Sequence, residues 1–163
     1  MKTVKQRRKA NKTDYLKRLK LLKSRKPRIV FRRTNKYVTA QYVLSKEAKD
    51  KVVFGVSSKD LLKFGWSQNA KGSLKNLTAC YFTGYLIGKQ IKNKKAETPI
   101  VDLGMLQTLH KTNVFGFLKG IKDSGIEIQV KEEALPDEAR IKGEHLKNKI
   151  NFEEIKKKIG ELK

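Results

Sequence analysis

The chain has 163 residues, with 39 Lys or Arg against 16 Asp or Glu, and its formal net charge at pH 7 is +23. This length suits one domain, or one domain with tails. So large a charge repels itself in a compact state unless a polyanion neutralises it, which favours nucleic acid as the partner and leaves an anionic membrane surface as the alternative. No run approaches the roughly 18 apolar residues of a membrane-spanning helix. No apolar stretch follows the basic start, so we expect no secretory signal.

The first quarter of the chain carries most of the excess charge. Residues 1–36 contain sixteen Lys or Arg and one acidic residue, Asp14. Residues 1–12 have no apolar periodicity and are expected to be disordered until they bind a partner. Thr13 is predicted to cap a short helix over 14–23 that has a basic face. Such an arm is typical of nucleic-acid binding, whereas the alternative, a tail that only aids solubility, is usually mixed in sign or acidic.

After Pro27 the apolar period changes to two, which predicts strands. Residues 28–33 and 37–44 are rich in β-branched and aromatic side chains and flank the turn signal Thr34-Asn35-Lys36, so they predict a β-hairpin. A third strand is predicted over 51–57. Three successive strands with short connections predict an antiparallel meander.

Helices are predicted in the middle of the chain. Ser73 is the expected cap of a helix that runs to about Lys92, in which Gly84 and Gly88 allow close packing of the helix on the sheet. Residues 99–103 predict a short strand. Asn113 is the expected cap of a helix over 114–124, which ends at Gly125. The order β-β-β-α-β-α implies a crossover connection and a mixed sheet, and hence an α/β fold with helices against the sheet.

The last forty residues differ in character. Residues 126–141 are acidic and interrupted by proline, with a short strand expected over 126–130. Asn151 and Glu154 resemble a capping box that opens an amphipathic helix, which we expect to pack on the domain or on another protein. The predicted organisation is a basic arm with a short helix over 1–27, an α/β RNA-binding core over 28–125 and a C-terminal extension over 126–163.

The residues that could support catalysis form no constellation. His110 and His145 have no partner at metal-ligand spacing, and Cys80 lies among apolar residues of a predicted helix, where a small core residue is the usual role. As the only cysteine, it also excludes an internal disulfide and fits a reducing setting. Residues 84–89 resemble a P-loop only superficially, because the spacing is one residue short and no Ser or Thr follows Lys89. We therefore expect no enzyme activity, metal, cofactor or small-molecule substrate.

The hairpin offers a better case for binding. Its cations can contact phosphates and release counterions, while Tyr37 and Thr34 can add stacking or 2′-hydroxyl contacts, which favour RNA over DNA. The alternative for the hairpin alone is a solvated edge strand guarded by charge, but the basic arm that precedes it favours RNA. The candidate RNA-binding residues are Arg7, Arg8, Lys9, Lys12, Arg18, Arg25, Lys26, Arg28, Arg32, Arg33, Thr34, Asn35, Lys36, Tyr37, Trp66 and Lys71.

Four stretches also carry a family pattern. They are residues 28–42 (RIVFRRTNKYVTAQY), Gly65-Trp66 together with residues 76–88, residues 114–120 (VFGFLKG) and residues 136–146 (PDEARIKGEHL). In this combination, from about Arg7 to Leu146, the chain resembles the archaeal form of the large-subunit ribosomal protein numbered eighteen in the universal nomenclature. The resemblance does not extend to residues 147–163.

The resemblance implies a structural constituent of the large ribosomal subunit, in the cytoplasm. It implies that the arm, and the sheet with its hairpin, bind 5S rRNA and attach it to large-subunit (23S-type) rRNA in the central protuberance, beside neighbouring ribosomal proteins. The segment 105–111 departs from the family pattern, because archaeal relatives carry a more basic loop there and this chain has only Lys111. An RNA role of that loop is therefore in question.

Overall fold

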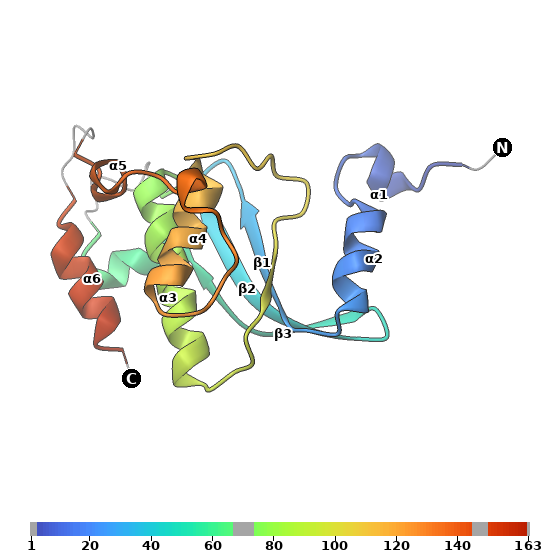
Figure 1. Ribbon diagram of the computed structural model, residues 1–163, viewed down its shortest axis with the longest axis horizontal. Coiled ribbons are helices and arrows are strands. Elements are labelled where there is room, and N and C mark those ends of the chain that lie inside the picture. Colours follow the sequence, from blue (N-terminus) through green and yellow to red (C-terminus); the bar gives the residue numbers. More distant parts are fainter. Residues whose placement is uncertain (1–2, 67–73, 145–149, 163) are drawn as a thin grey trace.

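Four strands form the sheet around which the helices are arranged. The computed structural model describes residues 3–66, 74–144 and 150–162. Helices α3 (Leu77–Asn93) and α4 (Asn113–Asp123) cover one face of the sheet, and α2 (Tyr15–Lys23) lies on its opposite side (Figure 1). The predicted α/β class is confirmed.

The sheet has the strand order β3-β2-β1-β4. Strands β1 (Arg28–Arg33), β2 (Val38–Lys46) and β3 (Lys49–Ser57) form the predicted antiparallel meander, and β4 (Ile100–Asp102) pairs with β1 in parallel. Strand β2 ends two residues later than predicted, at Lys46, and β3 begins two residues earlier, at Lys49. The two residues between them, Glu47 and Ala48, have φ values of 51° and 63°, so they make a tight two-residue turn without the Asn or Gly that normally signals one.

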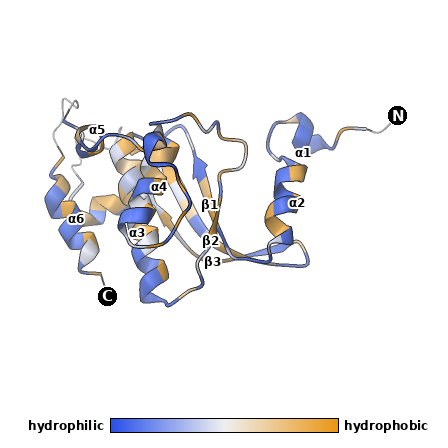
Figure 2. Cartoon of the chain, in the orientation of Figure 1, coloured by the Kyte–Doolittle hydropathy of each residue, from blue (hydrophilic) through white to orange (hydrophobic). Residues whose placement is uncertain are grey.

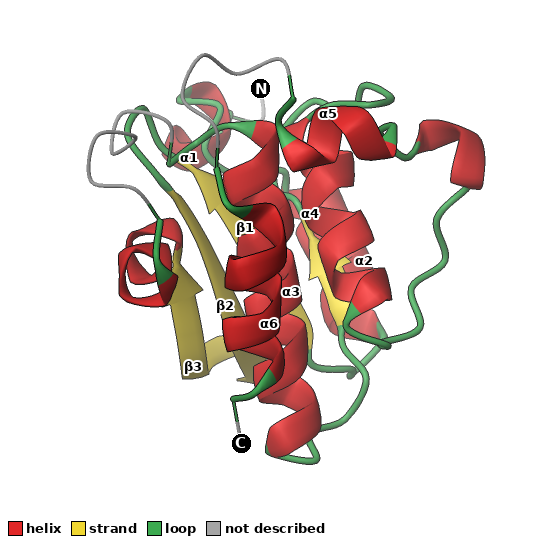
Figure 3. Cartoon of the chain, turned by 90° about the vertical axis from the view of Figure 1, so that its left-hand side faces the viewer, coloured by secondary structure: helices red, strands yellow, loops and turns green. Residues whose placement is uncertain are grey.

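Apolar side chains alternate along β1 and define the core. Ile29 and Phe31 are fully buried, and Phe31 stacks on Phe117 of α4 with a ring-centroid distance of 4.3 Å. Arg28 and Arg32 belong to the other face, because successive strand residues point to opposite sides. Figure 3 shows the resulting layers, with the C-terminal helix outside α3 and the sheet behind it.

Glycines bring α3 and α4 together. A Cβ atom at Gly84 would collide with the backbone carbonyl of Phe117, and one at Gly120 would collide with that of Tyr81. A Cβ at Gly88 would meet the Ser124 side chain at the end of α4. The predicted packing of Gly84 and Gly88 on the sheet is wrong: they allow helix-to-helix contact, because the small-residue face of α3 turns toward α4.

The helix caps differ from the predicted ones by one residue or more. Asn76 caps α3 by accepting from the Ala79 amide at 2.8 Å, and Ser73 lies outside the described residues. Thr112 is the N-cap residue of α4, because Asn113 is already helical and its side chain donates to the Lys75 carbonyl instead. Gly125 follows α4 with a φ of +89°, as its predicted role at the helix end requires.

The N-terminal arm contains two helices. A short helix, α1 (Gln6–Lys9), stands within the segment that we expect to be disordered. Asp14, and not Thr13, caps α2, because its carboxylate accepts from the Leu16 and Lys17 amides at 3.1 and 3.2 Å. Thr13 instead accepts a hydrogen bond from Arg7, which ties α1 to the start of α2.

The C-terminal segment contributes to the same core. It holds η3 (Glu132–Ala134), α5 (Glu138–Lys142) and α6 (Phe152–Gly160), but residues 126–130 form no strand, since they pair with no edge of the sheet. Ile155 and Ile159 of α6 are buried against α3 and η1 (Ser58–Phe64), so the predicted apolar stripe packs on this domain. The expected capping box is not formed, because the Asn151 side chain donates to the Glu154 carboxylate.

Candidate nucleic-acid interface

The hairpin tip is shaped by Thr34. Its hydroxyl donates to the Tyr37 carbonyl at 2.7 Å and accepts from the Tyr37 amide at 3.1 Å, so this side chain serves the turn itself. Lys59 lies over the Tyr37 ring, with its ammonium nitrogen 4.3 Å from the ring centroid. Asn35 and Lys36 are exposed at the tip, which leaves them available to a partner.

Arg32 and Arg33 point to opposite faces of the sheet. Arg32 donates to the carbonyls of Phe31 and Asp102 at 2.7 and 3.0 Å and lies 3.5 Å from the Asp102 carboxylate. The Arg33 side chain is exposed and makes no hydrogen bond or ion pair with the described residues. The two arginines therefore present their charge to different surroundings.

Two of the predicted RNA contacts are buried, and we withdraw both. Arg28 is 1% exposed, with its guanidinium enclosed by Asp102, Asp50 and Ser45. Trp66 is 2% exposed and packs edge-on against Phe82, so its ring cannot stack on a base. In the sequence, Arg28 and Trp66 are indistinguishable from an exposed cation and an exposed aromatic residue. Only the tertiary packing makes their side chains inaccessible to RNA. Lys71 lies outside the described residues.

The arm and the hairpin meet in a groove that we call the arm groove. Residues from α1, α2 and the loop between them line one side, and Arg32 and the end of β4 line the other. Four of the predicted RNA contacts come together there, from positions up to 25 residues apart in the chain. The lining residues are Arg7, Lys12, Thr13, Asp14, Lys17, Arg18, Leu21, Arg32, Asp102 and Gly104.

The remaining predicted arm cations do not line this groove, and Lys26 lines a different hollow beside β4. Arg8 lies 3.5 Å from the Asp14 carboxylate, while Lys9, Arg25 and Lys26 are exposed. Figure 2 shows α1 as almost wholly hydrophilic and α2 with both polar and apolar stripes. Lys17 is a groove residue missing from the predicted set, although its place beside Arg18 on the basic face of a predicted helix was a usable signal.

A second basic surface lies on the helix side of the sheet. Arg33 opens into a shallow hollow with His110, Lys111 and Arg140. Among the described residues no acidic side chain lines this hollow, although Asp137 lies 3.3 Å from the Lys111 ammonium. Met105 and Leu109 on the connecting loop are exposed there, at 42% and 62%. Cations with exposed apolar side chains thus gather around the loop whose RNA role the sequence left in question.

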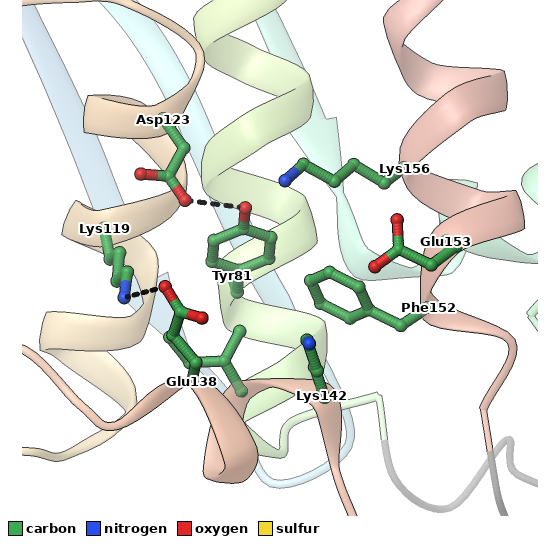
Figure 4. A pocket seen from close by; sticks show the side chains of 9 residues that line it. Tyr81, Lys119, Asp123, Glu138, Lys142, Phe152, Glu153 and Lys156 are labelled. Carbon is green, nitrogen blue, oxygen red and sulfur yellow. Dashed lines mark hydrogen bonds and ion pairs between the residues drawn. The ribbon is translucent and has the colours of Figure 1, made fainter.

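The pocket in Figure 4 lies between α3, α4, α5 and α6 and holds no catalytic arrangement. The Tyr81 hydroxyl donates to the Asp123 carboxylate at 2.8 Å, and Lys119 lies 3.9 Å from Glu138. Burial, with the hydrogen bond to Asp123, raises the pKa of Tyr81, so the phenol stays protonated and cannot act as a base. Within the described residues, no group of three or more His, Cys, Asp or Glu could hold a metal ion.

Membrane association through a spanning segment finds no support in the described part of the chain, where no helix has the length and apolar character needed to cross a bilayer. A sheet with one face sealed by apolar helices and cations gathered on an arm and a hairpin defines a nucleic-acid-binding protein. Comparison with known proteins specifies its family. Residues 1–101 match the family described as "Ribosomal large subunit proteins 60S L5, and 50S L18", and the chain belongs to this family.

The relatives agree with this assignment. The large ribosomal subunit protein uL18 of Korarchaeum cryptofilum is 44% identical over 140 residues, which cover 86% of this chain and 70% of the relative. The uL18 of Thermoplasma acidophilum is 36% identical over 156 residues, covering 96% of this chain and 93% of the relative. The uL18 of Aeropyrum pernix is 38% identical over 141 residues, which cover 86% of this chain and 64% of the relative.

Family membership confirms several expectations. The protein is an archaeal-type structural constituent of the large ribosomal subunit, found in the ribosome in the cytoplasm, and the family is not enzymatic. Membership of this family also implies that the ribosome and ribosomal RNA are its partners.

Proposed function

We propose that this chain binds 5S rRNA through the arm groove and the hairpin, and attaches it to 23S-type rRNA in the central protuberance, beside neighbouring ribosomal proteins. The observation that carries the proposal is the convergence of Arg7, Lys12, Arg18 and Arg32 on one groove. Arginine side chains grip phosphate in bidentate fashion, and each neutralised phosphate releases counterions, which drives association.

The two basic surfaces suit a protein that joins two RNA segments. The arm groove lies on one face of the sheet, and the hollow at Arg33 opens on the face that carries the helices. We assign 5S rRNA to the arm groove because residues 1–36, which comprise the arm, the first hairpin strand and the hairpin tip, hold sixteen Lys or Arg against one acid and so supply most of the net charge of +23. We assign a second RNA segment to the Arg33 side. The apolar stripe of α6 is buried within this domain, which removes the main surface that a protein-interaction scaffold would use.

A competition experiment tests the proposal. Labelled 5S rRNA is bound at moderate salt and challenged with unlabelled 5S rRNA or bulk tRNA. We expect 5S rRNA to compete at least about tenfold better, which corresponds to roughly 1.4 kcal/mol. A general RNA-binding module, or a scaffold that binds RNA only through charge, would show equal competition, and that result would contradict the proposal.

A matched pair of variants places the contact. Lys12→Ala removes one exposed cation from the arm groove, and Lys157→Ala removes one exposed cation from α6. We expect Lys12→Ala to weaken 5S rRNA binding and to lower the slope of log affinity against log salt by roughly one unit, because one phosphate contact is lost. Lys157→Ala should bind like the parent, and equal effects of the two variants would show that only total charge matters.

A further inference from the structure

Charged side chains between α2 and the sheet form a chain of alternating sign. Arg18 of α2 lies 3.0 Å from the carboxylate of Asp50 on β3, and the other oxygen of that carboxylate accepts from Arg28 of β1 at 2.8 Å. Arg28 donates in turn to Asp102 of β4 at 2.9 Å, and Asp102 lies 3.5 Å from Arg32. Five charges thus connect the arm helix to three strands.

Exposure changes along this chain of charges. The side chains in the middle are the most buried, at 1% for Arg28 and 9% for Asp102, while those at the ends, Arg18 and Arg32, are 33% and 46% exposed. Burial of a guanidinium is costly in free energy unless carboxylates and hydrogen bonds surround it. Arg28 therefore holds the Asp50 carboxylate in place, and the Ser45 hydroxyl also donates to this carboxylate at 2.8 Å. The carboxylate is therefore held ready to grip Arg18 from the sheet side.

The arm helix has few other attachments. None of its nine residues is buried. Among the described residues, its polar contacts with the sheet side are the Arg18–Asp50 pair, a hydrogen bond from Arg18 to the Ala48 carbonyl at 3.3 Å and one from Lys17 to the Gly104 carbonyl at 3.2 Å. Two of these three contacts depend on Arg18, and Asp50 supplies the only charged partner among them.

We propose that Asp50 is a positioning residue for RNA binding, which anchors α2 on the sheet and orients Arg18 in the arm groove before RNA arrives. This inference rests on the proposed function for its RNA part, but the anchoring itself belongs to the free protein. Ordering a segment before binding removes that ordering from the free energy of association, so a pre-positioned arm binds more tightly than a loose one.

Simple electrostatics predicts the opposite effect for this residue. Asp50 places a negative charge beside a surface that attracts a polyanion, so neutralising it should strengthen RNA binding if charge alone matters. Loss of positioning should weaken binding, because α2 and Arg18 would then have to be ordered by the RNA. The sign of the change therefore separates the two explanations.

The test compares Asp50→Asn with Glu47→Gln. Glu47 is an exposed acid in the turn between β2 and β3, three residues before Asp50, and it has no ion pair among the described residues. Its variant therefore makes the same charge change without removing the carboxylate that holds Arg18. We expect Asp50→Asn to weaken 5S rRNA binding about fivefold to tenfold and to speed amide hydrogen exchange over residues 15–23 of the free protein. Glu47→Gln should bind equally or slightly more tightly, with α2 exchange unchanged.

Asp50→Asn also removes a partner of the buried Arg28 and could therefore affect folding. A second variant separates such a folding effect from the loss of anchoring. Arg18→Met leaves the Asp50–Arg28–Asp102 part intact and should speed the exchange of α2 alone, with α3 amides unaffected. Unchanged α2 exchange in Arg18→Met, or tighter 5S rRNA binding by a folded Asp50→Asn, overturns the inference. If the parent itself fails to prefer 5S rRNA over tRNA, the proposed function fails, and the exchange data still decide the anchoring.

Discussion

The two faces of the sheet are covered by helices that are attached in different ways. Thirteen of the seventeen residues of α3 are buried, whereas none of the nine residues of α2 is. Apolar burial of the α3 kind depends little on salt or acid, while ion pairs at a partly exposed surface are weakened by salt and by acid strong enough to protonate their carboxylates. We call the face covered by α3 and α4 the permanent side, because its apolar core stabilises the fold. We call the opposite face, with α2 and the rest of the arm, the adjustable side, and we assign RNA binding to it.

The largest expected effect concerns the permanent side. Gly120→Ala would force a Cβ atom against the Tyr81 carbonyl, and both backbones are held within packed helices. We expect a loss of about 3 kcal/mol in the free energy of unfolding, measured by urea denaturation. Gly160→Ala is the control, since its Cβ would meet only the Tyr85 hydroxyl at 3.8 Å. Similar stability of the two variants would mean that the α3–α4 contact is not tightly packed.

The next effect concerns the two hairpin arginines. Arg32 borders the arm groove and Arg33 points away from it, so lysine at each position should have unequal consequences. We expect Arg32→Lys to weaken 5S rRNA binding by roughly 1–2 kcal/mol, the scale of a hydrogen bond to a charged group, because lysine lacks the planar fork. Arg33→Lys should be nearly silent in the same filter-binding assay. The reverse order would move the 5S rRNA interface to the helix side of the sheet.

Acid provides a smaller and more selective perturbation of the adjustable side. Burial acts to raise the pKa of Asp50, but hydrogen bonds from Ser45 and Arg18 and the charges of Arg28 and Arg18 outweigh it, so this pKa lies below its ordinary value of 3.8. A carboxyl with a depressed pKa stabilises the fold above its ordinary pKa and loses that contribution only as the pH falls through the depressed value.

Hydrogen exchange or NMR chemical shifts as a function of pH would follow this loss. We expect α2 to stay anchored at pH 5 and at pH 4 and to loosen only at lower pH, while α3 remains protected over the same window. Loosening of α2 already at pH 5 would contradict the role of Asp50 as its anchor.

The smallest effect is an expected lack of change at Cys80. This side chain is fully buried in α3, and burial raises the pKa of its thiol to about 12, although the nearby Arg33 acts in the opposite direction. Very little thiolate exists at pH 8, so labelling by a thiol reagent should be slow and should follow unfolding. We expect a higher salt concentration to weaken the ion pairs of the arm and to leave this labelling rate unchanged. Faster labelling at high salt would show that the two sides are coupled.

The four strands of the sheet were predictable because runs of apolar and β-branched residues are a local signal, and this signal located β1 closely. The meander and the mixed character of the sheet were also predicted, but the place of β4 beside β1 was not. The turn at Glu47 and Ala48 was not predictable, because neither residue favours a positive φ. The strand expected over 126–130 failed for a different reason, since strand pairing depends on an available sheet edge, which local sequence does not reveal.

The candidate interface shows the same division between local and long-range information. Charge counting identified the arm and the hairpin correctly as the basic segments. It could not tell Arg28 from Arg32 and Arg33, because burial of Arg28 depends on Asp50 and Asp102, which lie 22 and 74 residues away in the chain. For this reason the sequence did not reveal that Asp50 and Asp102 bind these arginines.

The central claim is that the adjustable side, with the arm at its centre, binds 5S rRNA. The most direct measurement is the salt dependence of 5S rRNA affinity for the full chain and for a variant that lacks residues 1–23, a deletion that ends at the last residue of α2 and keeps the buried Pro27, with thermal melting as the check on folding. We predict that the variant loses at least about three units of slope in log affinity against log salt, since several phosphate contacts disappear, while its melting temperature stays close to that of the parent. An unchanged slope in a folded variant would contradict the account, because the arm would then make no contact with the RNA.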